Sequence, residues 1–258
     1  MILHPLKNGL PQEAPKEILR LLASAPVYDS SCSPEARVYF IDKDGGYFLK
    51  SAKKDSLSLE AQMNAYFYKK GLGAEVLYHE SSAADWLLTA KVKGEDCTSK
   101  RYLDDPIRLC DTLAYHLRQL HELDASDCPI QNRMESYFKT VEENRNADAY
   151  DLSFGSFTCA DEAFAAFEQG KSLLNGKVLL HGDFCLPNVI LDNWSLSGYI
   201  DVGHGGIGDR HIDLFWGAWT LCFNLKTDAY RARFLDAYGR DLIDEDAIAT
   251  VAAAEIFG

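Results

Sequence analysis

Alternating and apolar runs in the first third of the chain predict β-strands. The runs "ARVYFID" (36–42) and "GYFLKSA" (46–52) are separated by "KDGG", a turn signal that predicts a β-hairpin. The runs "AEVLYHE" (74–80) and "DWLLTAKV" (85–92) predict two further strands. This part of the chain is therefore expected to form a sheet.

A helical spacing of apolar residues interrupts these strands. The residues recur at i, i+4, i+7 and i+8, which predicts an amphipathic helix; they are Leu59, Met63, Tyr66 and Phe67. Asp55, Ser56 or Ser58 is the expected N-cap, and Gly71 or Gly73 is expected to end the helix.

The rest of the chain has a mostly helical pattern. Asp105 and Pro106 predict a helix start, and one apolar face follows, formed by Cys110, Leu113, Leu117 and Leu120. Further helices are expected at 161–172, around Ile212, Phe215, Trp216, Trp219 and Phe223, and near 228–238 and 245–256. We therefore expect an α+β fold with two lobes: a small, mostly-β N-lobe (1–91), a connector near 89–94, and a larger helical C-lobe (92–258).

Composition narrows the classes of function. The chain has 258 residues, 47% of them hydrophobic and 25% charged, which suffices for a sizeable core. The formal charge of −13 argues against nucleic acid or an anionic membrane as partner and suits a cationic ligand. No apolar run approaches the ~20 residues that span a bilayer, and no signal peptide is recognisable. Seven cysteines without a C-x-x-C pair indicate reduced thiols. We expect a cytoplasmic protein, a monomer or weak dimer.

The segment from Leu179 to Gly206 carries the candidate chemistry. "HGDFCLPN" has the Asp-x-x-x-x-Asn spacing of a kinase catalytic loop, in which Asp183 would orient the substrate hydroxyl. Two strand-like runs follow and end in "DVG", where Asp201 takes the place of the magnesium-binding Asp. A hairpin brings Asn188 and Asp201 side by side, and their oxygens are ligands that Mg²⁺ prefers. The pattern predicts phosphoryl transfer.

A kinase also needs a phosphate-binding lysine with an acidic partner. Lys50 ends the strand "GYFLK", and Glu60 lies in the first turn of the next predicted helix, so these two residues fit the requirement. Two other classes stay open. One is a metal-dependent hydrolase, whose ligands would be His181, Asp183, Asp201, His204 and Asp209. The other is a nucleotide-binding module without activity.

Several segments resemble one particular family. "LLHGDFCLPNVILDNWSLSGYIDVGHGGIGDRHIDL" closely resembles the corresponding segment of aminoglycoside 3′-phosphotransferases. "RQLHELDASDCPI", "SPEARVYFI", "YFLK" and "DWLLTAKVKG" are similar to other parts of that family, so the resemblance covers nearly the whole chain. It implies a protein-kinase-like fold, ATP as phosphoryl donor with GTP as the alternative, Mg²⁺, and a small cationic acceptor.

The resemblance also implies roles for individual residues. Asp183 becomes the catalytic base, and Asn188 and Asp201 become the magnesium ligands. Asp213 resembles the acid that braces the catalytic loop. The implied nucleotide-binding residues are Lys50 with Glu60, Ser33 in the phosphate loop, Phe48 stacked on adenine, Ala90 and Val92 through their backbones, and Ile200.

The chain departs from the family pattern at the expected substrate site. His204 stands where the family usually has Arg, and "AAAEIFG" has Ala254 for an acid and Gly258 beyond Phe257. The acids left to bind a polyamine are Asp183, Glu255, Asp148 and Asp151. We therefore expect a narrow aminoglycoside range. The alternative is a kinase of the same fold that acts on another hydroxylated amine, an amino sugar or a macrolide.

Overall fold

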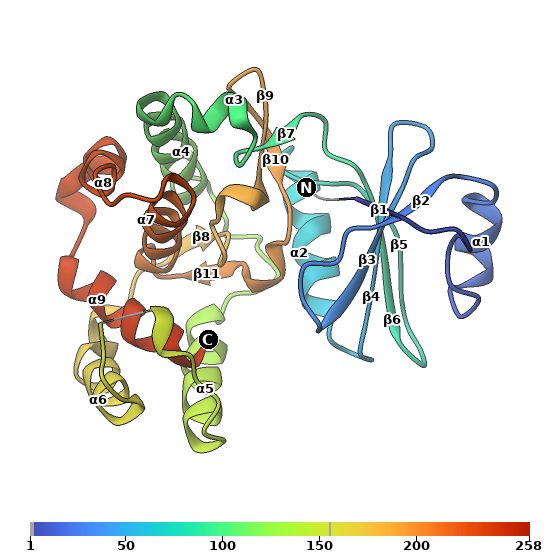
Figure 1. Ribbon diagram of the computed structural model, residues 1–258. Helices are drawn as coiled ribbons and strands as arrows, with labels where there is room; N and C mark the ends of the chain where they lie inside the picture. The colour runs from blue at the N-terminus through green and yellow to red at the C-terminus, as the bar shows by residue number, and fades with distance from the viewer. Residues whose placement is uncertain (1–2, 155) are drawn as a thin grey trace. The chain divides into compact units, whose positions relative to one another are not determined.

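The computed structural model describes residues 3–154 and 156–258, and the chain divides into two compact units. The N-terminal unit comprises Met1–Asp96 and Val189–Gly203, and the C-terminal unit comprises Cys97–Asn188 and His204–Gly258 (Figure 1). The segment Val189–Gly203 thus belongs to the N-terminal unit, although the residues on both sides of it in the sequence belong to the C-terminal unit. A single functional boundary after residue 91 stays a prediction.

The N-terminal unit contains a six-stranded antiparallel sheet in the order β1-β2-β3-β4-β6-β5. Its strands are β1 (His4–Pro5), β2 (Val27–Asp29), β3 (Ala36–Ile41), β4 (Tyr47–Ala52), β5 (Val76–Ser81) and β6 (Asp85–Ala90). The expected β3–β4 hairpin is present, and in its turn Gly46 donates a backbone hydrogen bond to Lys43 (2.8 Å). The prediction of β-structure in this region is confirmed.

Two helices cover opposite faces of this sheet (Figure 1). On one face, Leu49 and Leu88 pack with Ile18 of α1 (Lys16–Leu21). Side chains alternate along a strand, so Lys50 and its cross-strand neighbour Leu87 point to the other face. There Leu87 packs with Ala61 of α2 (Ser58–Lys69). The sheet thus directs Lys50 toward the side that α2 covers.

The start of α2 differs from the sequence expectation. Its N-cap is Leu57, and no local side chain caps the helix, so the expected cap at Asp55, Ser56 or Ser58 is wrong. The carboxylate of Asp85 on β6 accepts the Leu57 amide instead (2.7 Å). Leu59 is 49% exposed and does not belong to the buried face. The helix ends before Gly71, whose φ of 73° suits a glycine at this position.

The segment that returns to the N-terminal unit forms the expected hairpin. Strand β9 (Val189–Asp192) pairs with β10 (Ser195–Tyr199), and β7 (Glu95–Asp96) pairs with β9 on its other side. Both turn residues, Asn193 and Trp194, have positive φ, as in the tight turns that match strand twist. The Tyr199 amide donates to the Leu72 carbonyl after α2 (2.7 Å), which attaches the hairpin to that helix.

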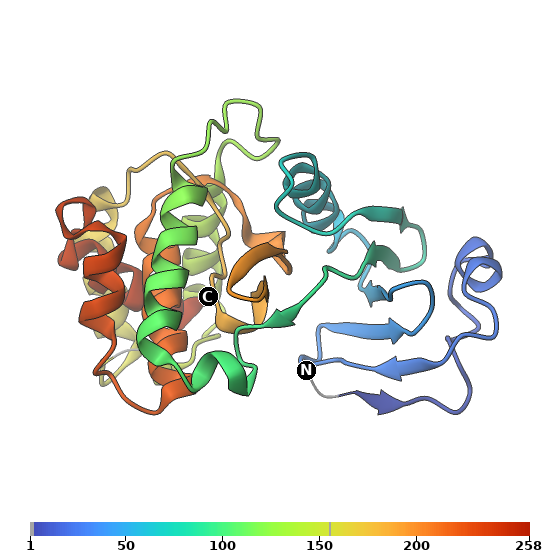
Figure 2. The same ribbon diagram turned by 90° about the horizontal axis from the view of Figure 1, so that it is seen from above.

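The C-terminal unit is mainly helical. Its helices are α3 (Lys100–Leu103), α4 (Pro106–His121), α5 (Arg133–Asn146), α6 (Ala160–Gly170), α7 (His211–Leu225), α8 (Arg231–Gly239) and α9 (Glu245–Ala254), and its small sheet pairs β8 (Val178–Leu180) with β11 (Gly206–Gly208). Helices α4 and α7 lie side by side (Figures 1 and 2). Asp105 caps α4 as expected. No helix within 3–154 or 156–258 is both long and apolar enough to cross a membrane.

Candidate active site

A charged cluster on the N-terminal unit contains the expected lysine and its partner. Lys50 Nζ lies 2.8 Å from Glu60 Oε2 and 3.0 Å from Asp201 Oδ1. We call these three residues the N-terminal half-site. Burial alone would lower the pKa of Lys50, but the carboxylates of Asp201 and Glu60 raise it above its ordinary value. Lys50 is therefore a fixed positive charge at neutral pH.

Asp201 has an unusual backbone. Its φ of 55° is left-handed, a conformation that residues other than glycine seldom adopt. The 3₁₀ turn η4 (Val202–His204) follows directly. Gly203 within this turn lies against Glu60, since a Cβ at Gly203 would be 3.2 Å from the Glu60 Cβ. The side chain of Asp201 is 52% exposed, so its carboxylate can reach a ligand.

In the C-terminal unit, the loop after residue 180 holds Asp183, the predicted catalytic base, in place. Asn188 Nδ2 donates to the Asp183 carboxylate at Oδ2 (2.8 Å) and to the Asp183 carbonyl (3.0 Å). Asn188 is buried in the 3₁₀ turn η3 (Leu186–Asn188), so both of its donors face the loop. Its amide oxygen is then the atom that could accept a cation.

A buried carboxylate holds this loop from α7. Asp213 is fully buried and accepts hydrogen bonds from the amides of His181 (2.8 Å) and Gly182 (2.7 Å). Gly182 has a φ of 87°, and a Cβ there would be 2.0 Å from the His204 carbonyl oxygen. The loop conformation thus requires both the acid and the glycine. We call Asp183, Asn188 and Asp213 the C-terminal half-site.

His121 and Tyr238 extend the hydrogen-bonding network of Asp213, and the sequence analysis had assigned no role to either residue. His121 Nε2 lies 3.1 Å from Asp213 Oδ2, and its Nδ1 lies 2.8 Å from the Tyr238 hydroxyl. Burial lowers the pKa of His121 although Asp213 opposes this, so the ring is neutral and donates to Asp213. The available signal was a histidine that continues the apolar face of α4.

The expected nucleotide-binding residues lie on several elements of the N-terminal unit. Phe48 lies two residues before Lys50 and so shares its face of the sheet, with its ring centroid 5.2 Å from that of Phe40. The Ala90 amide donates to the backbone carbonyl of Glu75 (2.9 Å), which leaves the Ala90 carbonyl as the group that could serve an adenine. Ser33 is exposed, while Val92 and Ile200 are half-buried. Their nucleotide contacts stay predictions.

The acids proposed for substrate binding differ in their environments. Glu255 begins the 3₁₀ turn η6 (Glu255–Phe257), is buried, and accepts a hydrogen bond from the Tyr137 hydroxyl (2.8 Å). Burial raises the pKa of Glu255 to about 7, although Tyr137 and nearby Arg133 oppose the shift. Asp151 is exposed, and its amide donates to the Ile256 carbonyl (2.8 Å).

Asp148, another acid expected to bind substrate, is 85% exposed and pairs with Arg145 (3.6 Å) just after the end of α5. The departure at position 204 also has a structural counterpart. Arg133 of α5 donates to the His204 carbonyl (2.7 Å) and lies 3.2 Å from His204 Nδ1. An arginine from another element therefore contacts the residue that stands at the family's arginine position.

The hydrolase alternative finds no support in the geometry of the C-terminal unit. Asp209 is occupied at both oxygens, because Oδ1 lies 2.6 Å from His211 Nδ1 and Oδ2 accepts the Gly176 amide (2.7 Å). Within the described part of the chain, no group of three His, Cys, Asp or Glu side chains is arranged to hold a metal.

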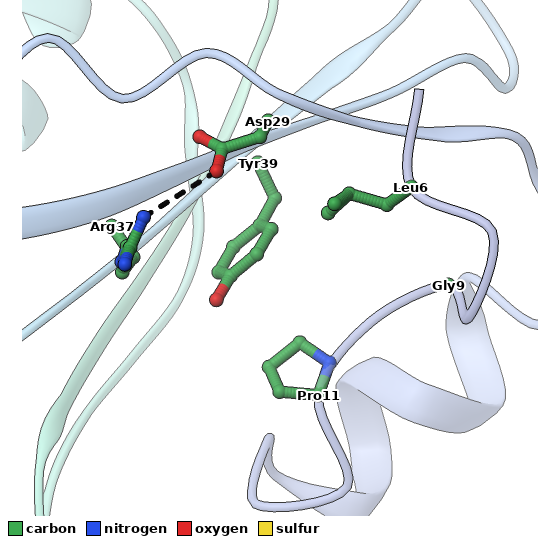
Figure 3. Close-up of a pocket in the computed structure, with 6 residues that line it drawn as sticks. All are labelled: Leu6, Gly9, Pro11, Asp29, Arg37 and Tyr39. Atoms are coloured by element: carbon green, nitrogen blue, oxygen red, sulfur yellow. Dashed lines mark hydrogen bonds and ion pairs between the residues drawn. The ribbon is translucent and has the colours of Figure 1, made fainter. Parts of the chain in front are cut away.

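A cavity of about 300 Å³ lies elsewhere in the N-terminal unit (Figure 3). It is lined by Leu6, Gly9, Pro11, Asp29, Arg37 and Tyr39. Tyr39 is paired with Leu49 and therefore points to the sheet face opposite Lys50. This cavity is distinct from the N-terminal half-site.

Comparison with known proteins identifies the family. The pattern of the phosphotransferase enzyme family matches residues 33–250. A protein of Lactococcus lactis subsp. lactis named "Probable aminoglycoside 3'-phosphotransferase" is 50% identical over 251 residues, 96% of each chain.

Solved structures share the fold. An aminoglycoside-3′-phosphotransferase of type VIII superposes with a TM-score of 0.73 at 24% identity, over 88% of this chain and 91% of that one. A Streptomyces rimosus aminoglycoside phosphotransferase, solved with ADP and streptomycin, has a TM-score of 0.71 at 24% identity, over 86% and 90%. The expected protein-kinase-like α+β fold is confirmed. Given the match over 33–250 and the 50% identical relative, the chain belongs to the phosphotransferase enzyme family that includes aminoglycoside 3′-phosphotransferases.

Proposed function

We propose that the protein transfers the γ-phosphoryl group of ATP to the 3′-hydroxyl of an aminoglycoside and thereby confers antibiotic resistance. The observation that carries the reaction type is the Asp183 carboxylate, fixed by Asn188 within a loop that Asp213 braces. The relative that is 50% identical supports the substrate class. The charge of −13 suits a polycationic acceptor.

Each half-site has a role in this reaction. Asp183 orients the acceptor hydroxyl and takes up its proton as the oxygen attacks phosphorus. Lys50 neutralises charge on the donor phosphates, and Glu60 holds the Lys50 ammonium in place. Because Asp183 is held in place before the reaction, little reorganisation of the base accompanies transfer.

The available donor atoms fit Mg²⁺. The exposed Asp201 carboxylate and the Asn188 amide oxygen, whose amide nitrogen is held by Asp183, are hard oxygen ligands of the kind this ion prefers. The ion, when bound, supplies positive charge against the phosphate oxygens. Asp201 and Asn188 would hold it.

A panel of aminoglycosides with and without the 3′-hydroxyl tests the proposal. ATP turnover with Mg²⁺ is expected only for compounds that carry this hydroxyl, with phosphate appearing on the drug. Asp183→Asn is expected to keep nucleotide binding while kcat falls on the order of 10²-fold or more. Turnover of amino sugars or macrolides alone would instead support another acceptor, and free phosphate as the only product would support hydrolysis.

A further inference from the structure

Asp85 is a buried acid to which the reaction described above assigns no role. It is the first residue of β6 and is fully buried. Its Oδ1 accepts the Asp55 amide (2.8 Å) and its Oδ2 accepts the Leu57 amide (2.7 Å). Both donors belong to the segment that leads into α2, so one carboxylate fixes two points of that segment.

These bonds replace a missing local cap. The first amides of a helix have no partner within the helix, and a nearby negative charge stabilises them. Leu57 at the N-cap of α2 provides no side-chain acceptor. Burial opposes ionisation of Asp85, yet hydrogen bonds from Ser81, Leu57 and Asp55 lower its pKa, so the group is a carboxylate at neutral pH.

The helix that Asp85 caps and the strand that pairs with β6 carry the groups that bind one another at the N-terminal half-site: Glu60 on α2 and Lys50 on β4. Glu60 is the third residue of α2, within one turn of the amides that Asp85 fixes. On the sheet, Asp85 is paired with Ala52, two residues along β4 from Lys50. A shift of the start of α2 would therefore move Glu60 relative to Lys50.

The Asp55 segment has further ties that make this attachment specific. Asp55 has a left-handed φ of 67°, and its carboxylate accepts the Ser81 hydroxyl (2.8 Å). Ser81 ends β5, which pairs with β6 at Asp85. The turn before α2 is thus fastened to the ends of two adjacent strands by side chains.

We propose that Asp85 is a positioning residue for nucleotide binding: by capping α2 from the sheet, it sets the position of Glu60 and hence of the Lys50 ammonium. The inference rests on the proposed function because it takes Lys50 as the phosphate-binding group. It requires no contact between Asp85 and the nucleotide. Loss of the Asp85 charge should therefore change nucleotide affinity and the surroundings of Lys50, and leave proton transfer at Asp183 intact.

Asp85→Asn tests this, with Asp105→Asn as the matched control because Asp105 caps α4 in the other unit. In Asp85→Asn, KM for ATP and the dissociation constant of ADP are expected to rise about tenfold, the factor of one charge-assisted hydrogen bond, while kcat stays close to wild type. Acylation of Lys50 by an amine-reactive acylating reagent, followed by mass spectrometry, is expected to accelerate in parallel. Asp105→Asn should change neither quantity.

Equal behaviour of the two variants in KM and in Lys50 acylation would overturn the proposal. If Asp85→Asn does not fold, Ser81→Ala decides by the same criteria, because Ser81 is exposed and its loss weakens the same attachment. If the wild-type protein binds no nucleotide, the proposed function fails, while the Lys50 acylation rates still decide whether Asp85 positions this lysine.

Discussion

The two half-sites hold their charged groups by different means. In the N-terminal half-site, side chains hold one another, and Lys50, Glu60 and Asp201 are 22%, 12% and 52% exposed. In the C-terminal half-site, the fully buried Asp213 carboxylate holds backbone amides of the catalytic loop. The first arrangement depends on side-chain rotamers. In the second, the Asn188 side chain also holds the Asp183 carboxylate, but on a loop whose main-chain conformation Asp213 fixes.

This difference has a consequence for function. A group held by neighbouring side chains can change partner when a charged ligand arrives, because only rotamers have to move. A loop held through its amides keeps its shape unless buried donors lose their acceptor, which is costly. We therefore expect substitutions in the N-terminal half-site to alter nucleotide affinity. Substitution of Asp213, which holds the loop amides, should alter stability and kcat together.

Asp201→Ala should give the largest effect on the N-terminal side. Removal of its carboxylate is expected to weaken Mg²⁺-dependent ATP binding on the order of 100-fold, because this is the charged oxygen donor available to the ion. Calorimetric titration with and without Mg²⁺ measures the change. Asp192→Ala, which removes the half-buried partner of the exposed Lys93 in the same unit, should leave Mg²⁺-dependent ATP binding unchanged. Affinity for Mg²⁺-ATP that survives in Asp201→Ala would contradict the assignment.

Asp213→Asn probes the C-terminal side. The amide cannot accept both loop amides and the His121 hydrogen bond, so the free energy of unfolding is expected to fall by about 1–3 kcal/mol. The kcat is expected to fall at least tenfold, because the loop that carries Asp183 loses its fixed conformation.

Denaturant unfolding and steady-state kinetics with a matched variant separate these two effects. Asp209→Asn also alters a buried carboxylate that accepts two amides, but away from the catalytic loop. It should lower stability without the loss of kcat. If kcat in Asp213→Asn is no lower than in Asp209→Asn, Asp213 serves only the stability of the fold.

Lys50→Met should have a smaller effect, which appears in KM rather than in stability. The methionine keeps the apolar stem but removes the charge, so KM for ATP is expected to rise about 10- to 100-fold. Thermal unfolding should change less than KM, because Asp201 is half exposed and Glu60, whose pKa burial already raises, can take up a proton when the lysine charge is gone. Lys93→Met, which breaks an exposed ion pair in the same unit, is the control. A large loss of stability with unchanged KM would make Lys50 a structural residue.

The smallest expected effect is a pH dependence from Glu255. With a pKa of about 7, this carboxyl is mostly neutral at pH 6 and mostly ionised at pH 8. Binding of a cationic substrate should therefore tighten by up to about tenfold over this interval. The stability of the free protein should change in the opposite sense, because a raised carboxyl pKa favours folding below about 4.5 and loses this contribution as pH rises through 7.

Glu255→Gln supplies the control for this profile. It should flatten the Glu255-dependent part of both curves, while the titration of the substrate amines continues unchanged. An identical pH profile of KM in the wild type and in Glu255→Gln would exclude Glu255 from substrate binding.

The sequence was most informative where function requires fixed residue types at fixed spacing. Lys50 at a strand and Glu60 in the next helix do form an ion pair, and the hairpin after Asn188 has the expected turn. Local periodicity also predicted α4 and its cap at Asp105. Each of these depends on interactions between residues close in the chain.

The misses concern groups that meet only in the folded chain. The cap of α2 comes from Asp85, 28 residues after Leu57, so the nearby Asp and Ser residues gave a wrong expectation. The pairing of β8 with β11 joins residues 178–180 to 206–208 and has no local signal. The link from His121 to Asp213 spans 92 residues. Such contacts follow from tertiary packing and not from local propensity.

The left-handed backbone of Asp201 has an evolutionary consequence. Aspartate tolerates this region better than most non-glycine residues, so the cost lies near the lower end of about 1–3 kcal/mol, and glycine avoids most of it. Selection for thermostability alone would therefore favour Asp201→Gly, and selection for turnover would reject it. A directed-evolution experiment that screens only for heat resistance should recover glycine at position 201 among its inactive survivors. At position 201, thermostability and turnover thus favour different residues.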